Sequence, residues 1–276
     1  MIRLAAFDLD GTTLKNHGEL SPENRRAILA AAQQGVLTVP ATGRLYSFLP
    51  PSLMSLPCIR YIVACNGAVV YDRAENRVLA ANLIPTQQAV ALMDLADAYN
   101  VYYEFYADGE AYTMRDHIRI AMEEKHFPEN RRVFLEKAYR AEVVDQKAYI
   151  LEQGICPEKI NLTYVPPEIR GELAQKLRET GWVEVASSRP DNLEINAAGV
   201  SKGSGLAMLC QKLHIDPSEV LAMGDEGNDL SMLHFAGVPV AMGNAPAVVQ
   251  AAAVYVTARC EEDGAAQALR RFIPGI

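Results

Sequence analysis

The sequence predicts an α/β protein with a doubly wound parallel sheet, Rossmann-like in its order of elements, into which a second α+β module is inserted. Two observations lead to this fold class. Short buried strands alternate with helices towards both ends of the chain, which favours parallel pairing with right-handed crossovers. Between Pro85 and Pro190 the pattern changes to helices that alternate with aromatic, more polar strands. We therefore expect a core domain formed by residues 1–84 and 191–276 and an inserted cap domain formed by residues 85–190.

The amino-terminal part of the core has clear start and stop signals. An apolar run ends abruptly at Asp8-Leu9-Asp10, as a buried strand does at a polar turn. Ser21 followed by Pro22 is typical of a helix start, and Gly35 is typical of its end. The predicted elements are strands at 2–9, 36–39 and 61–64, a helix at 22–34, and a hairpin at 68–83 that turns near 75–76.

The inserted module and the second part of the core follow the same reasoning. Trp182, Met208 and Met223 lie in apolar stretches, so we assign all three to the buried core. In the module, helices are predicted at 86–99 and 167–180, with strands at 101–106 and 159–165. In the returning core, helices are predicted at 202–214, 229–235 and 265–272, with strands at 220–223 and 238–242.

Composition excludes several functional classes. Of the 276 residues, 50% are hydrophobic and 22% charged, as in a globular chain with a sizeable core. Lys and Arg total 26 against 34 Asp and Glu, which gives a net charge of −8 and argues against nucleic acid or an anionic membrane as partner. The five cysteines form no C-x-x-C pair, and no signal-peptide or membrane-spanning pattern is present. We expect a cytoplasmic protein, and the sequence gives no indication of its oligomeric state.

Polar clusters follow the predicted strands, where open parallel sheets bind their ligands. In Asp8-Leu9-Asp10-Gly11-Thr12, two carboxylates lie close together, and their repulsion favours a bound cation or a raised pKa. Thr42-Gly43 follows the next strand. Lys202 begins a helix among small residues, and the loop 224–229 is acidic.

Each cluster also has a simpler interpretation. The first could be a calcium-type loop or a capped turn, and Thr42-Gly43 an ordinary turn. Lys202 could be a solvated lysine, and Asp225 to Asp229 a helix cap with surface acids. Arg44 could support a site or be an exposed turn residue. Four such coincidences at strand ends are much less expected than one shared site.

The clusters resemble the motifs of a known family. FDLDGTTL, ATGR, the lysine of GVSKGSGL, and GDEGNDLSML occur in the order of the four motifs of the haloacid dehalogenase-like (HAD) phosphatases. The insertion falls between the second and third motifs, and CNGAVV, LEI, VAMGNA and EEDGAA resemble strings of the Cof-like subfamily. The resemblance spans nearly the whole core, whereas the cap matches only in position and length.

The resemblance implies a Mg²⁺-dependent phosphoric monoester hydrolase that forms an aspartyl-phosphate. Asp8 would be the nucleophile, and Asp10 the general acid and then the general base. Lys202 would supply fixed positive charge at the transition state. The implied magnesium ligands are the Asp8 carboxylate, the Asp10 carbonyl and Asp225. The implied phosphoryl contacts are the Leu9 amide, Thr42, the Gly43 amide, Lys202 and Asn228, and Asp229 would support Lys202 or metal-bound water.

The expected partner is a small phosphorylated metabolite: a sugar phosphate, a nucleotide or a phosphorylated cofactor. Two alternatives stay open at this point. A phosphosugar mutase would pass the same aspartyl-phosphate to a substrate hydroxyl, and a sensor would bind the phosphometabolite without turnover. Isomerised phosphosugar with little free phosphate would favour the mutase. Absence of turnover across a broad panel would favour the sensor.

Overall fold

A computed structural model of the protein describes residues 1–15, 18–114 and 142–276, which divide into two units. Unit 1 comprises Met1–Arg44, Leu49–Ala81 and Ser201–Ile276. Unit 2 comprises Leu45–Phe48 and the described part of Asn82–Val200. The part of the predicted cap at 115–141 lies outside the described residues.

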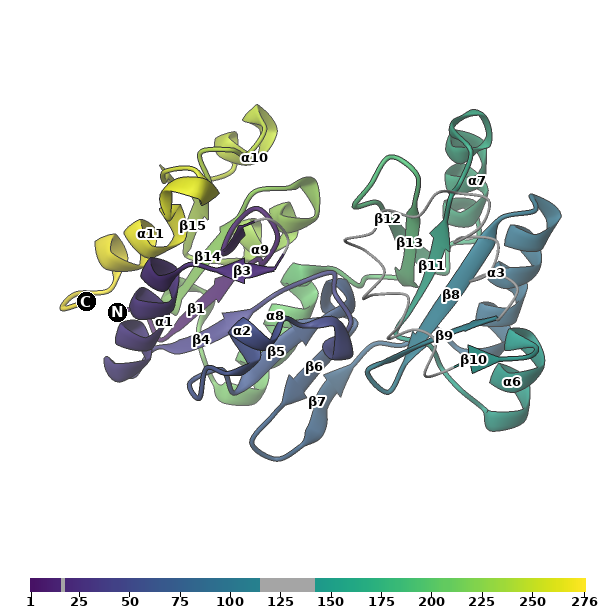
Figure 1. The fold of residues 1–276 in the computed structure, drawn as a ribbon, viewed down its shortest axis with the longest axis horizontal. Helices are drawn as coiled ribbons and strands as arrows, with labels where there is room; N and C mark the ends of the chain where they lie inside the picture. The colour runs from purple at the N-terminus through teal and green to yellow at the C-terminus, as the bar shows by residue number, and fades with distance from the viewer. Residues whose placement is uncertain (16–17, 115–141) are drawn as a thin grey trace. The chain divides into compact units, whose positions relative to one another are not determined.

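Unit 1 is built on a parallel five-stranded sheet with the order β16-β15-β14-β1-β4 (Figure 1). From β1 the chain first adds β4 on one side, and later adds β14, β15 and β16 on the other side. The strand order therefore reverses beside β1, which is where ligands bind in sheets of this kind. The strands are β1 (Leu4–Phe7), β4 (Leu37–Pro40), β14 (Val220–Gly224), β15 (Val238–Ala241) and β16 (Tyr255–Val256).

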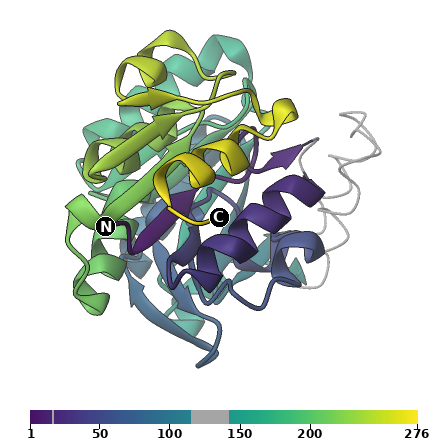
Figure 2. The same cartoon turned by 90° about the vertical axis from the view of Figure 1, so that its left-hand side faces the viewer.

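Helices cover both faces of this sheet, which confirms the predicted doubly wound α/β class. The Ser21 side chain accepts a hydrogen bond from the Asn24 N–H at 3.0 Å and so caps α1. Figure 2 shows α1 and α11 side by side on one face, while α8 and α9 pack together on the other. The helices are α1 (Pro22–Gln33), α2 (Pro51–Met54), α8 (Lys202–Leu213), α9 (Leu230–Phe235), α10 (Ala247–Ala251) and α11 (Gly264–Phe272).

A three-stranded antiparallel sheet continues unit 1 beyond β4. A parallel bridge between Ala41 and Val63 links the end of β4 to β5. The predicted hairpin is confirmed, with its turn at residues 73–76. The strands are β5 (Tyr61–Ala64), β6 (Val69–Asp72) and β7 (Arg77–Ala81), and a separate small ribbon pairs β2 (Leu14–Lys15) with β3 (Glu19–Leu20). Short 3₁₀ turns in unit 1 include η2 (Cys65–Gly67), η5 (Pro217–Glu219), η6 (Gly227–Asp229) and η7 (Cys260–Glu262).

Unit 2 has a six-stranded sheet with the order β10-β9-β8-β11-β13-β12, antiparallel except between β10 and β9 (Figure 1). Its helix α3 packs against both α6 and α7. This inserted α+β architecture is the one the sequence predicts. The strands are β8 (Tyr102–Ala107), β9 (Glu110–Met114), β10 (Glu142–Val143), β11 (Lys159–Thr163), β12 (Val183–Ala186) and β13 (Leu193–Ala197). The helices are α3 (Thr86–Ala98), α6 (Gln146–Gln153) and α7 (Pro167–Glu179), with η1 (Tyr46–Phe48) before them in the chain.

The division of the chain differs in three places from the predicted boundaries. The longer stretch of unit 2 begins at Asn82 and not at residue 85. Strand β13 pairs with β11 and β12, so the chain returns to unit 1 at Ser201 and not at residue 191. The tetrapeptide Leu45–Phe48 belongs to unit 2. In unit 2 the Ser47 N–H donates to the Gly109 carbonyl at 3.2 Å, and the Phe48 ring lies edge-on to Tyr106 at 6.3 Å between centroids.

The core assignments hold for two of the three large side chains. Met223 is fully buried in β14, and Met208 packs against the main core cluster of unit 1. The assignment of Trp182 was wrong, because 41% of this residue is exposed. Trp182 follows the turn after α7 and precedes β12, the edge strand of its sheet, where one face lacks a neighbour. Among the described residues, no helix has both the length and the apolar character needed to cross a membrane.

Candidate active site

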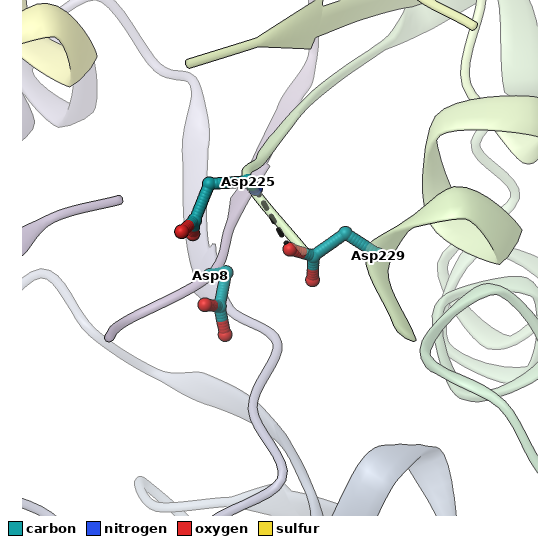
Figure 3. A group of neighbouring side chains, drawn as sticks. All are labelled: Asp8, Asp225 and Asp229. Carbon is teal, nitrogen blue, oxygen red and sulfur yellow. Dashed lines mark hydrogen bonds between the residues drawn. The ribbon is translucent and has the colours of Figure 1, made fainter. Parts of the chain in front are cut away.

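The carboxyl ends of β1 and β14 bring two distant aspartates together. These strands are parallel neighbours with Phe7 opposite Met223, and the Asp8 N–H donates to the Met223 carbonyl at 3.0 Å. Asp8 and Asp225 therefore leave the same edge of the sheet, and both are buried. Figure 3 shows their carboxylates close to each other and to that of Asp229. The structure thus places the first and fourth motifs side by side.

Lys202 forms ion pairs with two of these aspartates, Asp8 and Asp229. Its Nζ lies 2.6 Å from Asp8 Oδ1 and 2.5 Å from Asp229 Oδ1, and only 1% of the residue is exposed. Burial disfavours the charged ammonium, but the two carboxylates outweigh that effect and raise the pKa of Lys202 above its ordinary value. Lys202 therefore stays positively charged inside the protein.

Asp229 shapes the acidic loop. Its Oδ2 accepts hydrogen bonds from the backbone N–H groups of Asp225 at 2.8 Å and Glu226 at 2.9 Å. A Cβ atom at Gly224 would lie 2.4 Å from the Asp229 Cβ, so the close approach requires glycine. Together with the bond from Lys202, these contacts use both oxygens of Asp229. This side chain holds the loop and the lysine in place.

Asp225 is held by two side chains from other loops. Thr12 Oγ1 donates to its Oδ1 at 2.7 Å, and Asn244 Nδ2 donates to its Oδ2 at 3.1 Å. Asn244 also donates to the Gly11 carbonyl at 3.0 Å, which ties the first loop to the fourth. Gly11 has φ +80°, and a Cβ there would lie 2.3 Å from Asp225 Oδ2. No role was predicted for Asn244, although it follows a predicted strand as the other site residues do.

The three aspartates could bind a cation. One carboxylate oxygen of each lies within 4.8 Å of the others. Burial raises the pKa of Asp8 well above its ordinary value, against the effect of Lys202, and the neighbouring charge of Asp229 raises it further. Burial raises the pKa of Asp225 to about 7, opposed by the hydrogen bond from Thr12. A hard divalent cation with oxygen ligands would relieve this excess of buried negative charge, so these donors fit such an ion.

Asp10 faces a different partner. Arg44 Nε donates to Asp10 Oδ2 at 2.7 Å, and a terminal nitrogen of the same guanidinium donates to Oδ1 at 2.5 Å. The Arg44 side chain is 13% exposed and that of Asp10 34%. The sequence allowed Arg44 to be either a residue that supports a site or an exposed turn residue. The structure excludes the second interpretation, because the side chain is largely buried and paired.

The remaining predicted residues lie in the loops that follow β1, β4 and β14. Thr42 is buried after β4, and its N–H donates to the Val63 carbonyl at 2.9 Å. Gly43 follows it and is partly exposed. The Leu9 side chain is buried, and its carbonyl accepts the Leu14 N–H at 2.8 Å, which closes the first loop. Asn228 is partly exposed in η6, between Asp225 and Asp229 in the chain.

The doubly wound sheet and the acidic group at its switch point are those of a haloacid dehalogenase-like hydrolase with a Rossmann-like core. The chain belongs to this family, because the family model for haloacid dehalogenase-like hydrolases matches residues 5–269. Within the family it is an enzyme of the phosphatase type, as its curated relatives are.

Relatives of defined activity match along nearly their whole length. The chain is 32% identical over 272 residues to a 5-amino-6-(5-phospho-D-ribitylamino)uracil phosphatase of Bacillus subtilis, with 99% of this chain and 96% of the relative covered. It is 28% identical to the pyridoxal phosphate phosphatase of Escherichia coli, with 96% of each chain covered. A solved HAD-superfamily phosphatase from Bacteroides thetaiotaomicron has a TM-score of 0.78 at 27% identity and covers 99% of this chain, with 95% of its own chain covered.

Proposed function

We propose that this phosphatase hydrolyses phosphate monoesters of small metabolites through an aspartyl-phosphate on Asp8. The observation that carries the proposal is the pairing of Asp8 Oδ1 with Lys202 Nζ at 2.6 Å, in a group that also contains Asp225 and Asp229. An anionic nucleophile must approach an anionic phosphoryl group, and the buried ammonium of Lys202 offsets part of that repulsion. The other Asp8 oxygen would attack phosphorus in line with the departing ester oxygen.

Asp10 would transfer the protons. It would donate a proton to the departing alkoxide and later take one from the water that attacks the aspartyl-phosphate. Its place two residues after Asp8, in the loop that follows β1, supports this assignment. Lys202, Thr42, Asn228 and the amides of Leu9 and Gly43 would hold the phosphoryl oxygens.

We assign Mg²⁺ to the Asp8 carboxylate, the Asp10 carbonyl and Asp225. The buried carboxylate oxygens and the raised pKa values of Asp8 and Asp225 support a divalent cation here. When bound, Mg²⁺ would lower the negative charge that the nucleophile and the phosphoryl group share. Asp229 would contribute by fixing Lys202 and the loop of Asp225, since its oxygens already accept three hydrogen bonds.

We assign selection of the leaving group to the inserted module, which the sequence delimits as residues 85–190. The names of two relatives guide the choice of substrates. One relative acts on a phosphorylated ribitylaminouracil and the other on pyridoxal phosphate, which are both phosphate esters attached to a heterocyclic group. We therefore place heterocycle-bearing phosphate monoesters first among the candidates.

The test is to incubate purified protein and Mg²⁺ with a panel of phosphate monoesters and to measure released phosphate. The panel contains these two esters, sugar phosphates, nucleotides and p-nitrophenyl phosphate. We expect phosphate release that requires Mg²⁺ and is lost in Asp8→Asn. Isomerised phosphosugar with little free phosphate would contradict the proposal and indicate a phosphosugar mutase. Binding without turnover across the panel would contradict it and indicate a sensor.

A further inference from the structure

The guanidinium of Arg44 binds the Asp10 carboxylate in a geometry that fixes the orientation of that carboxylate. Two nitrogens of one guanidinium meet the two oxygens of Asp10, at 2.7 and 2.5 Å. A two-pronged pair of this kind defines the plane and the direction of the carboxylate as well as its position. Asp10 is the residue to which the proposed function gives both proton transfers, so what fixes it bears on the reaction.

Arg44 is itself held by its backbone. Its N–H donates to Thr42 Oγ1 at 3.1 Å, and its carbonyl accepts the Cys65 N–H at 3.0 Å. These bonds attach Arg44 to the loops that follow β4 and β5. Its side chain is largely buried, unlike those of most surface arginines. Because its backbone is fixed in this way, the guanidinium can impose an orientation on Asp10.

Asp10 takes part in both halves of the proposed reaction, first at the departing alkoxide and then at the attacking water. The second transfer needs a carboxylate oxygen directed at the water. The two-pronged pair fixes the direction of both Asp10 oxygens. We propose that Arg44 is a positioning residue for the second half of the reaction, in which it orients the Asp10 carboxylate while that carboxylate takes a proton from water.

This inference rests on the proposed function, and its chemical step is the hydrolysis of the aspartyl-phosphate. The water oxygen bonds to phosphorus, and the bond between phosphorus and the Asp8 oxygen breaks. The proton of the water moves to Asp10, and inorganic phosphate leaves. Arg44 takes no part in the bonds that form or break.

The experiment is steady-state and rapid-mixing kinetics of Arg44→Gln with p-nitrophenyl phosphate and Mg²⁺. The nitrophenolate leaves readily, so the first half needs little acid assistance. We expect kcat and KM to fall together by about 10- to 100-fold while kcat/KM keeps its wild-type value, because kcat/KM reports only the first half. The variant should also release a burst of nitrophenol and accumulate phosphoenzyme, detectable by intact mass.

Two further variants separate positioning from loss of structure. Arg44→Lys keeps the charge without the two-pronged geometry and should show a kcat between those of Arg44→Gln and the wild type. Arg60→Gln is the matched control, because Arg60 makes an equivalent pair with Asp72, at 3.0 and 2.9 Å, before β5 begins. It should have wild-type kinetics and no burst.

Other results would overturn the inference. A fall in kcat/KM equal to the fall in kcat would place Arg44 in the first half, and a raised KM at unchanged kcat would make it a substrate contact. Unchanged kinetics in a folded Arg44→Gln would remove any role. Failure of the proposed function looks different, since the wild type would then release no phosphate and no variant would carry a phosphoryl group.

Discussion

Two buried lysines, one in each unit, form similar ion pairs in different surroundings. Lys202 in unit 1 lies at the start of a helix between Asp8 and Asp229, with Asp225 close by. Lys159 in unit 2 lies within a strand and pairs with Glu194 on the adjacent strand, at 3.2 Å. In unit 1, three carboxylates lie close together and one ammonium pairs with two of them, which leaves an excess of negative charge that suits a cation.

The surroundings of the two lysines differ as well. Lys159 lies over the ring of Tyr106, with its Nζ 4.9 Å from the centroid, so it is packed within a sheet face. Lys202 is surrounded by loops in which glycines allow close approach, as Gly224 does for Asp229. Burial and pairing are therefore common to both lysines. The two groups differ in the number of carboxylates and in their position at strand ends, and on these differences we base the proposed roles.

The largest effect should come from Asp8→Asn. The amide is nearly isosteric but cannot attack phosphorus, so we expect phosphate release to fall by about 10⁴-fold or more. The variant should unfold at about the wild-type temperature, since it also removes a buried carboxylate whose pKa burial raises. Measured phosphate release checks the loss of turnover, and thermal unfolding checks that the stability is unchanged. Retained turnover would remove Asp8 from the role of nucleophile.

Lys202→Met should cause the second-largest loss of turnover. Loss of the ammonium removes the charge that offsets repulsion between Asp8 and the phosphoryl group, so we expect kcat to fall by about 10²- to 10³-fold. Lys159→Met is the comparison that sharpens the contrast. It removes the ammonium that pairs with the buried carboxylate of Glu194 and should cost about 3 kcal/mol of stability.

Urea unfolding and phosphate release measured on both variants test this pair. We expect the double variant Lys159→Met/Glu194→Leu to regain most of the lost stability, because it removes both buried charges. If Lys159→Met were to lose turnover as severely as Lys202→Met while staying folded, the distinction between the two lysines would be wrong.

Asp225→Ala should act on the metal requirement. Removal of one oxygen ligand should raise the half-saturating Mg²⁺ concentration by about 10- to 100-fold. Treatment of the wild type with a chelator should abolish turnover, and added Mg²⁺ should restore it. Glu226→Gln is the control, since it changes one charge at an exposed neighbouring position. Identical metal titrations for Asp225→Ala and the wild type would show that Asp225 is not a ligand.

The smallest change in kcat is expected for a substitution at one of two glycines in the acidic loop, Gly224 and Gly227. Gly224→Ala would force its Cβ to within 2.4 Å of the Asp229 Cβ, whereas a Cβ at Gly227 meets nothing within 4 Å. We expect Gly224→Ala to lower kcat by about 10-fold through displacement of Asp229 and Lys202. Gly227→Ala should match the wild type. Equal kinetics for the two variants would contradict the close packing of the loop.

The parts of the fold and the site that the sequence predicts are those with local signals. Asp8 and Lys202 stand directly after a strand and at a helix start, so local signals locate them in the fold, and their roles follow from the family resemblance. Asn244 and Arg44 also follow predicted strands, but nothing local indicates their contacts, because their partners come from other loops. β13 was predicted as part of the core domain. Its apolar and polar residues alternate, which predicts a strand but does not show which sheet that strand joins.

The tetrapeptide Leu45–Phe48 has a consequence for domain exchange. Because these four residues belong to unit 2 while their flanking segments belong to unit 1, unit 2 is assembled from two separate stretches of chain. A chimaera that replaces only residues 82–200 with the equivalent stretch of a relative would set Ser47 and Phe48 against foreign counterparts of Gly109 and Tyr106. Grafts designed to transfer specificity should carry both stretches together.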